Sequence, residues 1–275
     1  MAVVVTTALL ALVPQALSGR TARAYPVLAP EAIVVVAGQP RSVADLLQHH
    51  RPVQRRRPAT PSPPLSAVRT EAVEAEGRLD LVYYFSWENE IAPRRLLHLA
   101  YALFRAARYG TVEDIEAHQV SVDLASGEVV RLRFDSTTSD DYFELVPRHD
   151  RQVWVREPDG VFRGRTWKGE LRQVPCWEGE RVVVGVHSWN HCSRLLTVDE
   201  LPAFSLVDEA PLVPLDDASY RRLKMTRRGA GDHGTLESPG SRWLSKSSWA
   251  VLGLVPAVAL GWWWRRHRVS TPAGP

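Results

Sequence analysis

The chain has 275 residues, of which 45 % are hydrophobic and 24 % charged, and its formal net charge is +3. These values are typical of an ordinary globular protein. The small net charge argues against a nucleic-acid partner. The basic runs at 51–57, 221–228 and 265–268 are better explained as solvated linkers or as contacts with anionic lipid.

The N-terminus has the pattern of a signal peptide. An apolar run covers residues 2–12 and is followed by the small-residue spacing A-x-A at 22–24, which is typical of a cleavage site. We therefore expect residues 1–24 to be a signal peptide and the mature chain to be exported. No Lys or Arg precedes the apolar run, so an uncleaved anchor stays open as the alternative.

Residues 25–50 predict a strand followed by a short helix. The apolar run 32–37 favours the strand, and Ser42 is placed to cap the helix. Residues 51–67 are rich in Pro and Arg, a composition that is typical of a stiff linker or a long loop.

Residues 68–215 predict a β-rich extracytoplasmic domain. Residues 79–87 are rich in aromatic and β-branched side chains, and 116–124 alternate between polar and apolar before a Ser-Gly turn and a return strand at 130–134. Apolar residues recur at helical spacing over 93–109, which predicts the main helix. Further strands are expected at 142–146, 153–156, 161–163 and 181–186.

The C-terminus predicts a single membrane span. Residues 247–264 carry no charge and have Trp near both ends, where amphipathic rings prefer the membrane interface. A helix of this length crosses most of a hydrocarbon core of about 30 Å. We expect 216–246 to be a basic juxtamembrane linker and 265–275 a short cytoplasmic tail. Basic residues flank the span on both sides, so the orientation rests on the signal peptide, and trimming of the tail stays open.

These elements together predict an α+β fold that is mainly β. The expected architecture is an antiparallel β-sandwich-like domain with one main helix, plus the C-terminal transmembrane helix. The predicted location is therefore the membrane, with a single pass and the main domain outside the cytoplasm.

An acidic and imidazole-bearing set is the strongest candidate for a site. Strand alternation places Asp114, Glu116 and His118 on the face that is otherwise apolar, where such groups are costly unless they are paired or bound to metal. His187 would join them if the strand at 181–186 lay beside theirs. Oxygen and imidazole ligands suit a divalent cation. The alternative is structural: Asp114 caps a turn, Glu116 pairs with an arginine such as Arg131 or Arg133, and the histidines are ordinary.

The two cysteines and the remaining polar groups leave the chemistry open. Cys176 and Cys192 would form a disulfide in an exported protein, or stay as two buried thiols. Glu88 and Glu90 are interpreted as a solvated strand end. No G-x-S-x-G, C-x-x-C, H-E-x-x-H or phosphate-binding glycine loop occurs in the sequence, so no enzyme class is predicted.

Short segments resemble a known group. Residues 25–31, the aromatic strand 83–85, the block 114–120 and the segment 185–188 resemble the vacuolar-protein-sorting-sixty-two-like family and the related necrosis-inducing (Nep-like) proteins. The resemblance covers roughly 25–195. It implies an exported or membrane-associated β-sandwich, with a divalent metal at the acidic element in the Nep-like branch.

Carried over to this chain, Asp114 and Glu116 match the acidic pair of the Nep-like element. His118 matches the histidine that follows it, and His187 the late one. Ile115 stands where the group has tryptophan and Glu113 where glycine or histidine is usual, and both departures weaken the metal assignment.

Three functional hypotheses follow. The first is a membrane-anchored envelope protein whose outer domain binds a divalent cation together with a lipid, glycan or protein partner. The second is a metal-dependent hydrolase that uses the same residues to activate water. The third is a structural envelope protein without a ligand site.

Overall fold

The computed structural model describes residues 27–60, 62–91, 98, 99, 102, 114–137, 149–166 and 168–215. All of them belong to one compact unit, residues 1–235. The expected signal peptide, juxtamembrane linker, membrane span and tail lie outside the described residues, as do the strand at 142–146 and most of the helix at 93–109. Within the described ranges, no helix has the length and apolar character that a membrane crossing requires.

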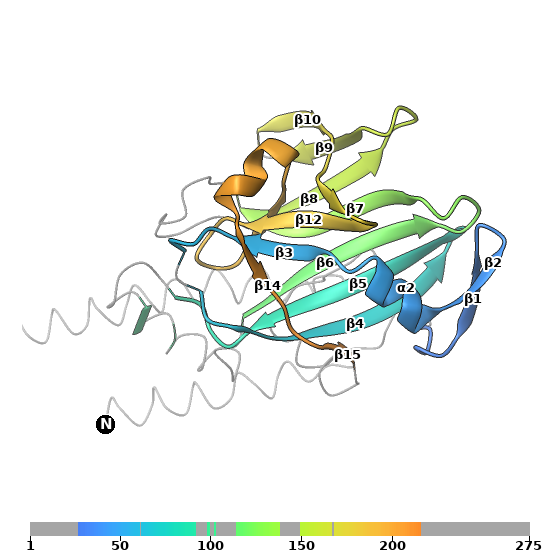
Figure 1. The fold of residues 1–275 in the computed structure, drawn as a ribbon, viewed down its shortest axis with the longest axis horizontal. Helices are drawn as coiled ribbons and strands as arrows, with labels where there is room; N and C mark the ends of the chain where they lie inside the picture. Colours follow the sequence, from blue (N-terminus) through green and yellow to red (C-terminus); the bar gives the residue numbers. More distant parts are fainter. Residues whose placement is uncertain are drawn as a thin grey trace, which may run out of the picture. The chain divides into compact units, whose positions relative to one another are not determined.

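The larger of two main sheets has eight strands in the order β10-β9-β8-β7-β6-β5-β4-β15 (Figure 1). It is antiparallel except at its edge, where β15 runs parallel to β4. The expected hairpin around Ser126-Gly127 is present as β6 and β7. The strands are β4 (Leu65–Ala75), β5 (Arg78–Trp87), β6 (Asp114–Asp123), β7 (Val129–Thr137), β8 (His149–Arg156), β9 (Phe162–Thr166), β10 (Gly169–Gln173) and β15 (Leu212–Pro214).

A second, mixed sheet has the strand order β11-β12-β3-β14, and β13 also pairs with β12. β3 and β12 run parallel, side by side, so the expected antiparallel architecture holds for most of the larger sheet, whereas this sheet is mixed. The strands are β3 (Val53–Arg56), β11 (Trp177–Glu178), β12 (Arg181–Val186), β13 (Ser193–Leu195) and β14 (Leu206–Asp208). The remaining elements are β1 (Ile33–Val36), β2 (Gln39–Ser42), α2 (Val43–His49) and the 3₁₀ helix η2 (Val198–Ala203).

The stretch 51–67, expected as a linker or loop, contains a central strand. Val53 and Gln54 of β3 are buried, and β3 lies between β12 and β14. Arg55 and Arg56 are accommodated because their guanidinium groups pair with acidic residues of neighbouring segments, Glu178 and Asp208. Pro52 directly precedes the strand and the other prolines of this stretch follow it, so none interrupts its hydrogen-bond ladder.

The two sheets share one hydrophobic core, which makes the domain mainly β with few helices. The large sheet contributes Leu81, Phe85 and Trp87 among others, and the mixed sheet contributes Val184 and Val186. Burial of these side chains supplies the main driving force for the fold.

The strand β1 and the helix α2 form where the sequence predicts them, and β2, which was not predicted, completes a hairpin with β1. Ala37 and Gly38 have positive φ values of 49° and 76°, as a two-residue hairpin turn requires. The Ser42 side chain accepts a hydrogen bond from the Asp45 backbone N–H at 3.1 Å and so caps α2.

The parallel pair β3–β12 determines where functional side chains gather. Its register pairs Val53 with Val183 and Arg56 with Val186. Carried back three residues, the same register brings His50 opposite Glu180. Beyond the other ends of the two strands lie the Pro-rich segment after Arg56 and the loop 187–192. Each end of the pair therefore brings together segments that are far apart in the sequence.

Candidate functional site

The predicted acidic face of β6 exists. Asp114, Glu116 and His118 are 2 %, 0 % and 1 % exposed, and His118 contacts the core aromatic rings. His187 is buried directly after β12. The four side chains do not converge into one group of ligands: in the part of the chain that the structure describes, three potential ligand atoms come within 4.8 Å of one another only at His49, His50 and Glu180. A cation at Asp114 and Glu116 stays a prediction.

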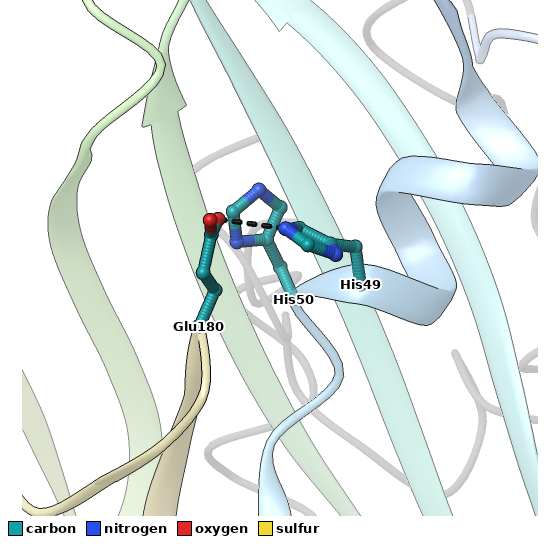
Figure 2. Close-up of side chains that lie close together, drawn as sticks. All are labelled: His49, His50 and Glu180. Carbon is teal, nitrogen blue, oxygen red and sulfur yellow. Dashed lines mark ion pairs between the residues drawn. The ribbon is translucent and has the colours of Figure 1, made fainter.

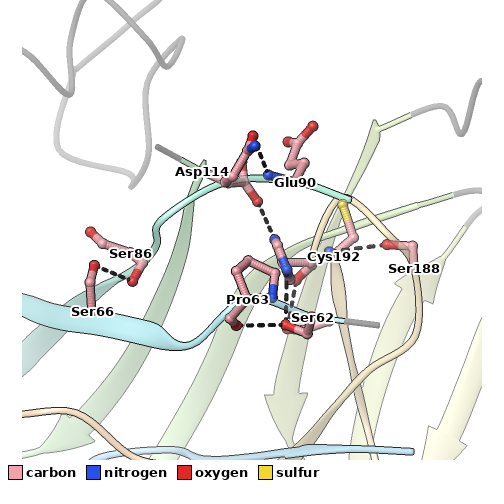
Figure 3. A network of polar contacts seen from close by, with 11 residues as sticks. Ser62, Pro63, Ser66, Ser86, Glu90, Asp114, Ser188 and Cys192 are labelled. Carbon is pink, nitrogen blue, oxygen red and sulfur yellow. Dashed lines mark hydrogen bonds and ion pairs between the residues drawn. The ribbon is translucent and has the colours of Figure 1, made fainter. Parts of the chain in front are cut away.

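Asp114 belongs instead to a hydrogen-bonded chain with His191 and Ser62 (Figure 3). His191 Nδ1 lies 2.8 Å from Asp114 Oδ2, and His191 Nε2 lies 3.2 Å from Ser62 Oγ. The indole of Trp87 stacks on the His191 ring with centroids 4.4 Å apart and planes within 3°. These contacts fix the position of the His191 imidazole and the orientation of its plane.

The loop 187–192 holds His191 in an unusual backbone conformation. Its φ is +58°, in the left-handed region that only a few per cent of residues other than Gly adopt, with Asn, Asp and His the most frequent among them. Three backbone N–H groups close the loop: His187 donates to the Cys192 carbonyl, His191 to the Ser188 carbonyl, and Cys192 to the Ser188 hydroxyl. Strain of this kind, about 1–3 kcal/mol, is commonly found at functional sites.

His118 connects the two sheets. Its ring lies 4.8 Å from the ring of Phe85 and 5.7 Å from that of Phe134, measured between centroids. The Gln54 amide nitrogen of β3 lies 3.3 Å from both ring nitrogens. This environment is that of a core histidine.

Both cysteines are buried thiols, so the disulfide between them is not formed. The two cysteines lie beside different points along β12. The Cys176 carbonyl accepts a hydrogen bond from the Val183 backbone N–H, whereas the Cys192 carbonyl accepts one from the His187 backbone N–H. Four residues of extended chain span about 13 Å, which is beyond the reach of a disulfide. Burial raises the pKa of the Cys176 thiol. Glu90 also differs from expectation, since it is buried rather than solvated.

A second cluster lies at the opposite end of the β3–β12 pair, where His49 and His50 at the end of α2 meet Glu180 before β12 (Figure 2). His49 Nε2 lies 2.7 Å from Glu180 Oε2. The two imidazoles meet edge to face, with centroids 5.0 Å apart. The sequence analysis did not identify this cluster; the His-His pair was visible, but its partner depends on the parallel register.

His50 is neutral near pH 7. Burial, first, and then the neighbouring His49 lower its pKa from 6.5 to about 4, against opposing contributions from Glu180. Its Nδ1 has no hydrogen-bond partner in the described part of the chain. In the neutral ring one of the two nitrogens carries a lone pair that can accept a metal ion.

A neutral imidazole is the form in which histidine binds a metal ion. Ligands of a tetrahedral zinc ion lie about 3.4 Å from one another. Small side-chain rotations would bring the three groups, now within 4.8 Å of one another, to that spacing.

Comparison with known proteins gives distant structural neighbours. No protein-family model matches the chain, and no curated protein matches it in sequence. A structure described as "Toxin fold for microbial attack and plant defense" has a TM-score of 0.39 and 13 % identity, with 78 % of this chain and 93 % of that one covered. Necrosis and Ethylene inducing Protein 2 from the causal agent of cocoa's Witches Broom disease has a TM-score of 0.34 and 13 % identity, with 82 % and 97 % covered.

A third neighbour is NLPPya in complex with glucosamine, with a TM-score of 0.37, 13 % identity and coverage of 78 % and 90 %. One of these neighbours is named as a necrosis- and ethylene-inducing protein and another as a toxin fold. Identities and TM-scores this low support no inference about the ligand of the present chain.

Proposed function

We propose that the chain is a membrane-anchored envelope protein whose β-rich domain lies outside the cytoplasm and binds a divalent transition-metal cation through His49, His50 and Glu180. The observation that carries the cation is the convergence of two imidazoles and a carboxylate within 4.8 Å. The membrane anchor and the export rest on the sequence patterns at 247–264 and 1–24.

The ligand types favour Zn²⁺ or a similar transition metal over Mg²⁺ and Ca²⁺. Imidazole nitrogen is a good ligand for Zn, Cu, Fe and Ni, whereas Mg²⁺ and Ca²⁺ are bound almost entirely by oxygen. Because His50 is already neutral near pH 7, a metal would displace no proton from it.

The cluster is open to solvent on one side. The side chains of His49 and Glu180 are 38 % and 61 % exposed, whereas His50 is 3 % exposed. Three protein ligands leave a position on a tetrahedral ion for water or for an external donor atom. A lipid, glycan or protein partner would reach the cation from this side.

The test is a thermal-shift titration of the full chain. After treatment with a chelator, the melting temperature is measured against Zn²⁺, Ni²⁺, Mn²⁺, Mg²⁺ and Ca²⁺. Binding at 100 times the dissociation constant stabilises the folded state by about 2.7 kcal/mol, which corresponds to a rise of roughly 5–10 °C. We expect this rise with Zn²⁺ or Ni²⁺, and not with Mg²⁺ or Ca²⁺.

Variants assign the shift to the cluster. Glu180→Gln and His49→Ala should abolish the metal-dependent rise. The matched control is Glu178→Gln, because Glu178 lies two residues away at the end of β11 and its carboxylate pairs with Arg55 instead. No shift with any ion, or a shift that Glu180→Gln leaves unchanged, would refute the proposed site.

A further inference from the structure

Ser62, His191 and Asp114 are connected as the members of a serine hydrolase triad are. The nucleophile candidate lies at one ring nitrogen of the histidine and the carboxylate at the other, at 3.2 Å and 2.8 Å. We propose that these three residues hydrolyse carboxylic esters, with Ser62 as nucleophile, His191 as general base and acid, and Asp114 as the residue that positions His191.

The hydrogen-bond pattern fixes the tautomer that this chemistry needs. An ionised Asp114 carboxylate only accepts hydrogen bonds, so in the neutral imidazole Nδ1 carries the proton and donates it to Asp114. Nε2 then presents its lone pair to the Ser62 hydroxyl. The same division of roles defines the Ser-His-Asp triad on unrelated folds.

Of the three residues of the proposed triad, two are buried and one is accessible. The side chains of His191 and Asp114 are 1 % and 3 % exposed, and Trp87 covers one face of the imidazole. Ser62 is only partly buried, so its hydroxyl is the member that an ester could reach. Pro63 and Pro64 follow it and restrict the backbone that carries the nucleophile.

The Ser62 hydroxyl has a choice of two acceptors. It donates to the Pro63 carbonyl at 3.0 Å and also lies within hydrogen-bond distance of His191 Nε2. Rotation about the Cβ–Oγ bond therefore turns its proton toward the base without movement of the backbone (Figure 3).

The proposed reaction needs only an ester and water. As Ser62 Oγ bonds to the ester carbonyl carbon, its proton moves to His191 Nε2. The bond from that carbon to the alcohol oxygen then breaks, and His191 gives the proton to the departing alkoxide. Water attacks the resulting acyl-serine, passes a proton to His191, and the collapse of this second tetrahedral species returns the proton to Ser62 Oγ and releases the acid.

The site is independent of the proposed cation. Ser62 and His191 follow the C-terminal ends of β3 and β12, whereas His49, His50 and Glu180 precede their N-terminal ends. Failure of one assignment therefore leaves the other standing, and treatment with a chelator distinguishes the two.

The experiment treats the chelator-washed full chain with a fluorophosphonate probe and with p-nitrophenyl acetate. We expect covalent labelling on the peptide that contains Ser62, and ester hydrolysis with an acyl-enzyme burst. Ser62→Ala should abolish both while the chain stays folded, since it removes a single partly buried hydroxyl. The matched control is Ser66→Ala, because Ser66 is a nearby hydroxyl that donates to the Ser86 carbonyl. It should retain labelling and turnover.

Asp114→Asn tests the positioning role. Loss of the correct tautomer lowers kcat by about 10⁴-fold in serine proteases, so we expect kcat for the ester to fall steeply while KM is unchanged. A folded wild-type chain in which the probe does not label Ser62, or hydrolysis that persists unchanged in Ser62→Ala, would overturn the proposal.

Discussion

His50 is a buried imidazole at the end of a short helix, and its titration makes the domain sensitive to acid. Its pKa is lowered from 6.5 to about 4 by burial first, with His49 and Arg41 acting in the same direction and Glu180 against them. Between these two pH values the unfolded chain binds more protons at this residue than the folded chain does. The free energy of unfolding therefore falls as the pH falls from about 6.5 to about 4.

We expect the metal-free chain to lose up to about 3 kcal/mol of stability across this window through His50 alone. Urea unfolding at several pH values between 7.5 and 4 measures the loss. His50→Gln keeps an amide N–H near the position of Nε2 and cannot be protonated in this range. The free energy of unfolding of this variant should therefore lack the loss of up to about 3 kcal/mol that His50 contributes to the wild type. Parallel pH profiles for the two proteins would contradict this assignment.

Gly164 is required by the ring that covers it. It pairs directly with Trp154 across β8 and β9, and a Cβ at residue 164 would lie 2.4 Å from the indole. The glycine therefore provides the space in which a core tryptophan lies flat on the neighbouring strand.

Gly164→Ala should destabilise the domain by about 1–3 kcal/mol, the usual cost of overpacking a core. Urea unfolding measures this cost. The double variant Gly164→Ala/Trp154→Leu serves as control: the alanine should cost less in that background than in the wild type, because the clash with the indole is gone. Equal costs in both backgrounds would refute the steric explanation.

Among the elements, strands with alternating sequences were predictable and the charged strand was not. β6 and β7 alternate in sequence and their hairpin formed as expected. β3 has the sequence VQRR beside a Pro-rich segment, and the carboxylates of Glu178 and Asp208 that pair with its Arg residues lie more than 100 residues away. No local pattern reports such partners, so the strand was interpreted as a linker.

The pairing of Arg56 with Asp208 joins β3 to β14 at 2.9 Å. The Asp208 side chain is only 9 % exposed. Arg56→Met keeps much of the apolar stem but leaves this carboxylate without its cation, so we expect a loss of about 1.5–3 kcal/mol in the free energy of unfolding. Arg56→Met/Asp208→Asn should recover part of the loss in a double-mutant cycle. A coupling energy near zero would show that the pair does not hold the two strands together.

For the whole molecule, local patterns were sufficient for the class of fold and insufficient for the sites. The sequence placed Asp114, Glu116 and His118 correctly on the apolar face, because alternation along one strand is a local property. It could not place His191 beside Asp114 or Glu180 beside His49, since these contacts join segments that are 77 and 131 residues apart. A mainly β domain was predicted, but its parallel pairs depend on long-range topology that periodicity does not encode.

One candidate cluster lies at each end of the parallel pair β3–β12. A shift of β12 against β3 would separate Glu180 from His50 and, in the same step, carry His191 away from Ser62. Val182, Val184 and Val186 of β12 pack in one apolar cluster and Val183 packs in another. A shift by one residue would exchange these two faces of the strand, so the packing resists it. The register of β3 against β12 therefore sets the geometry of both clusters. A substitution in the middle of the pair that shifted this register would disturb both clusters, although it touches neither.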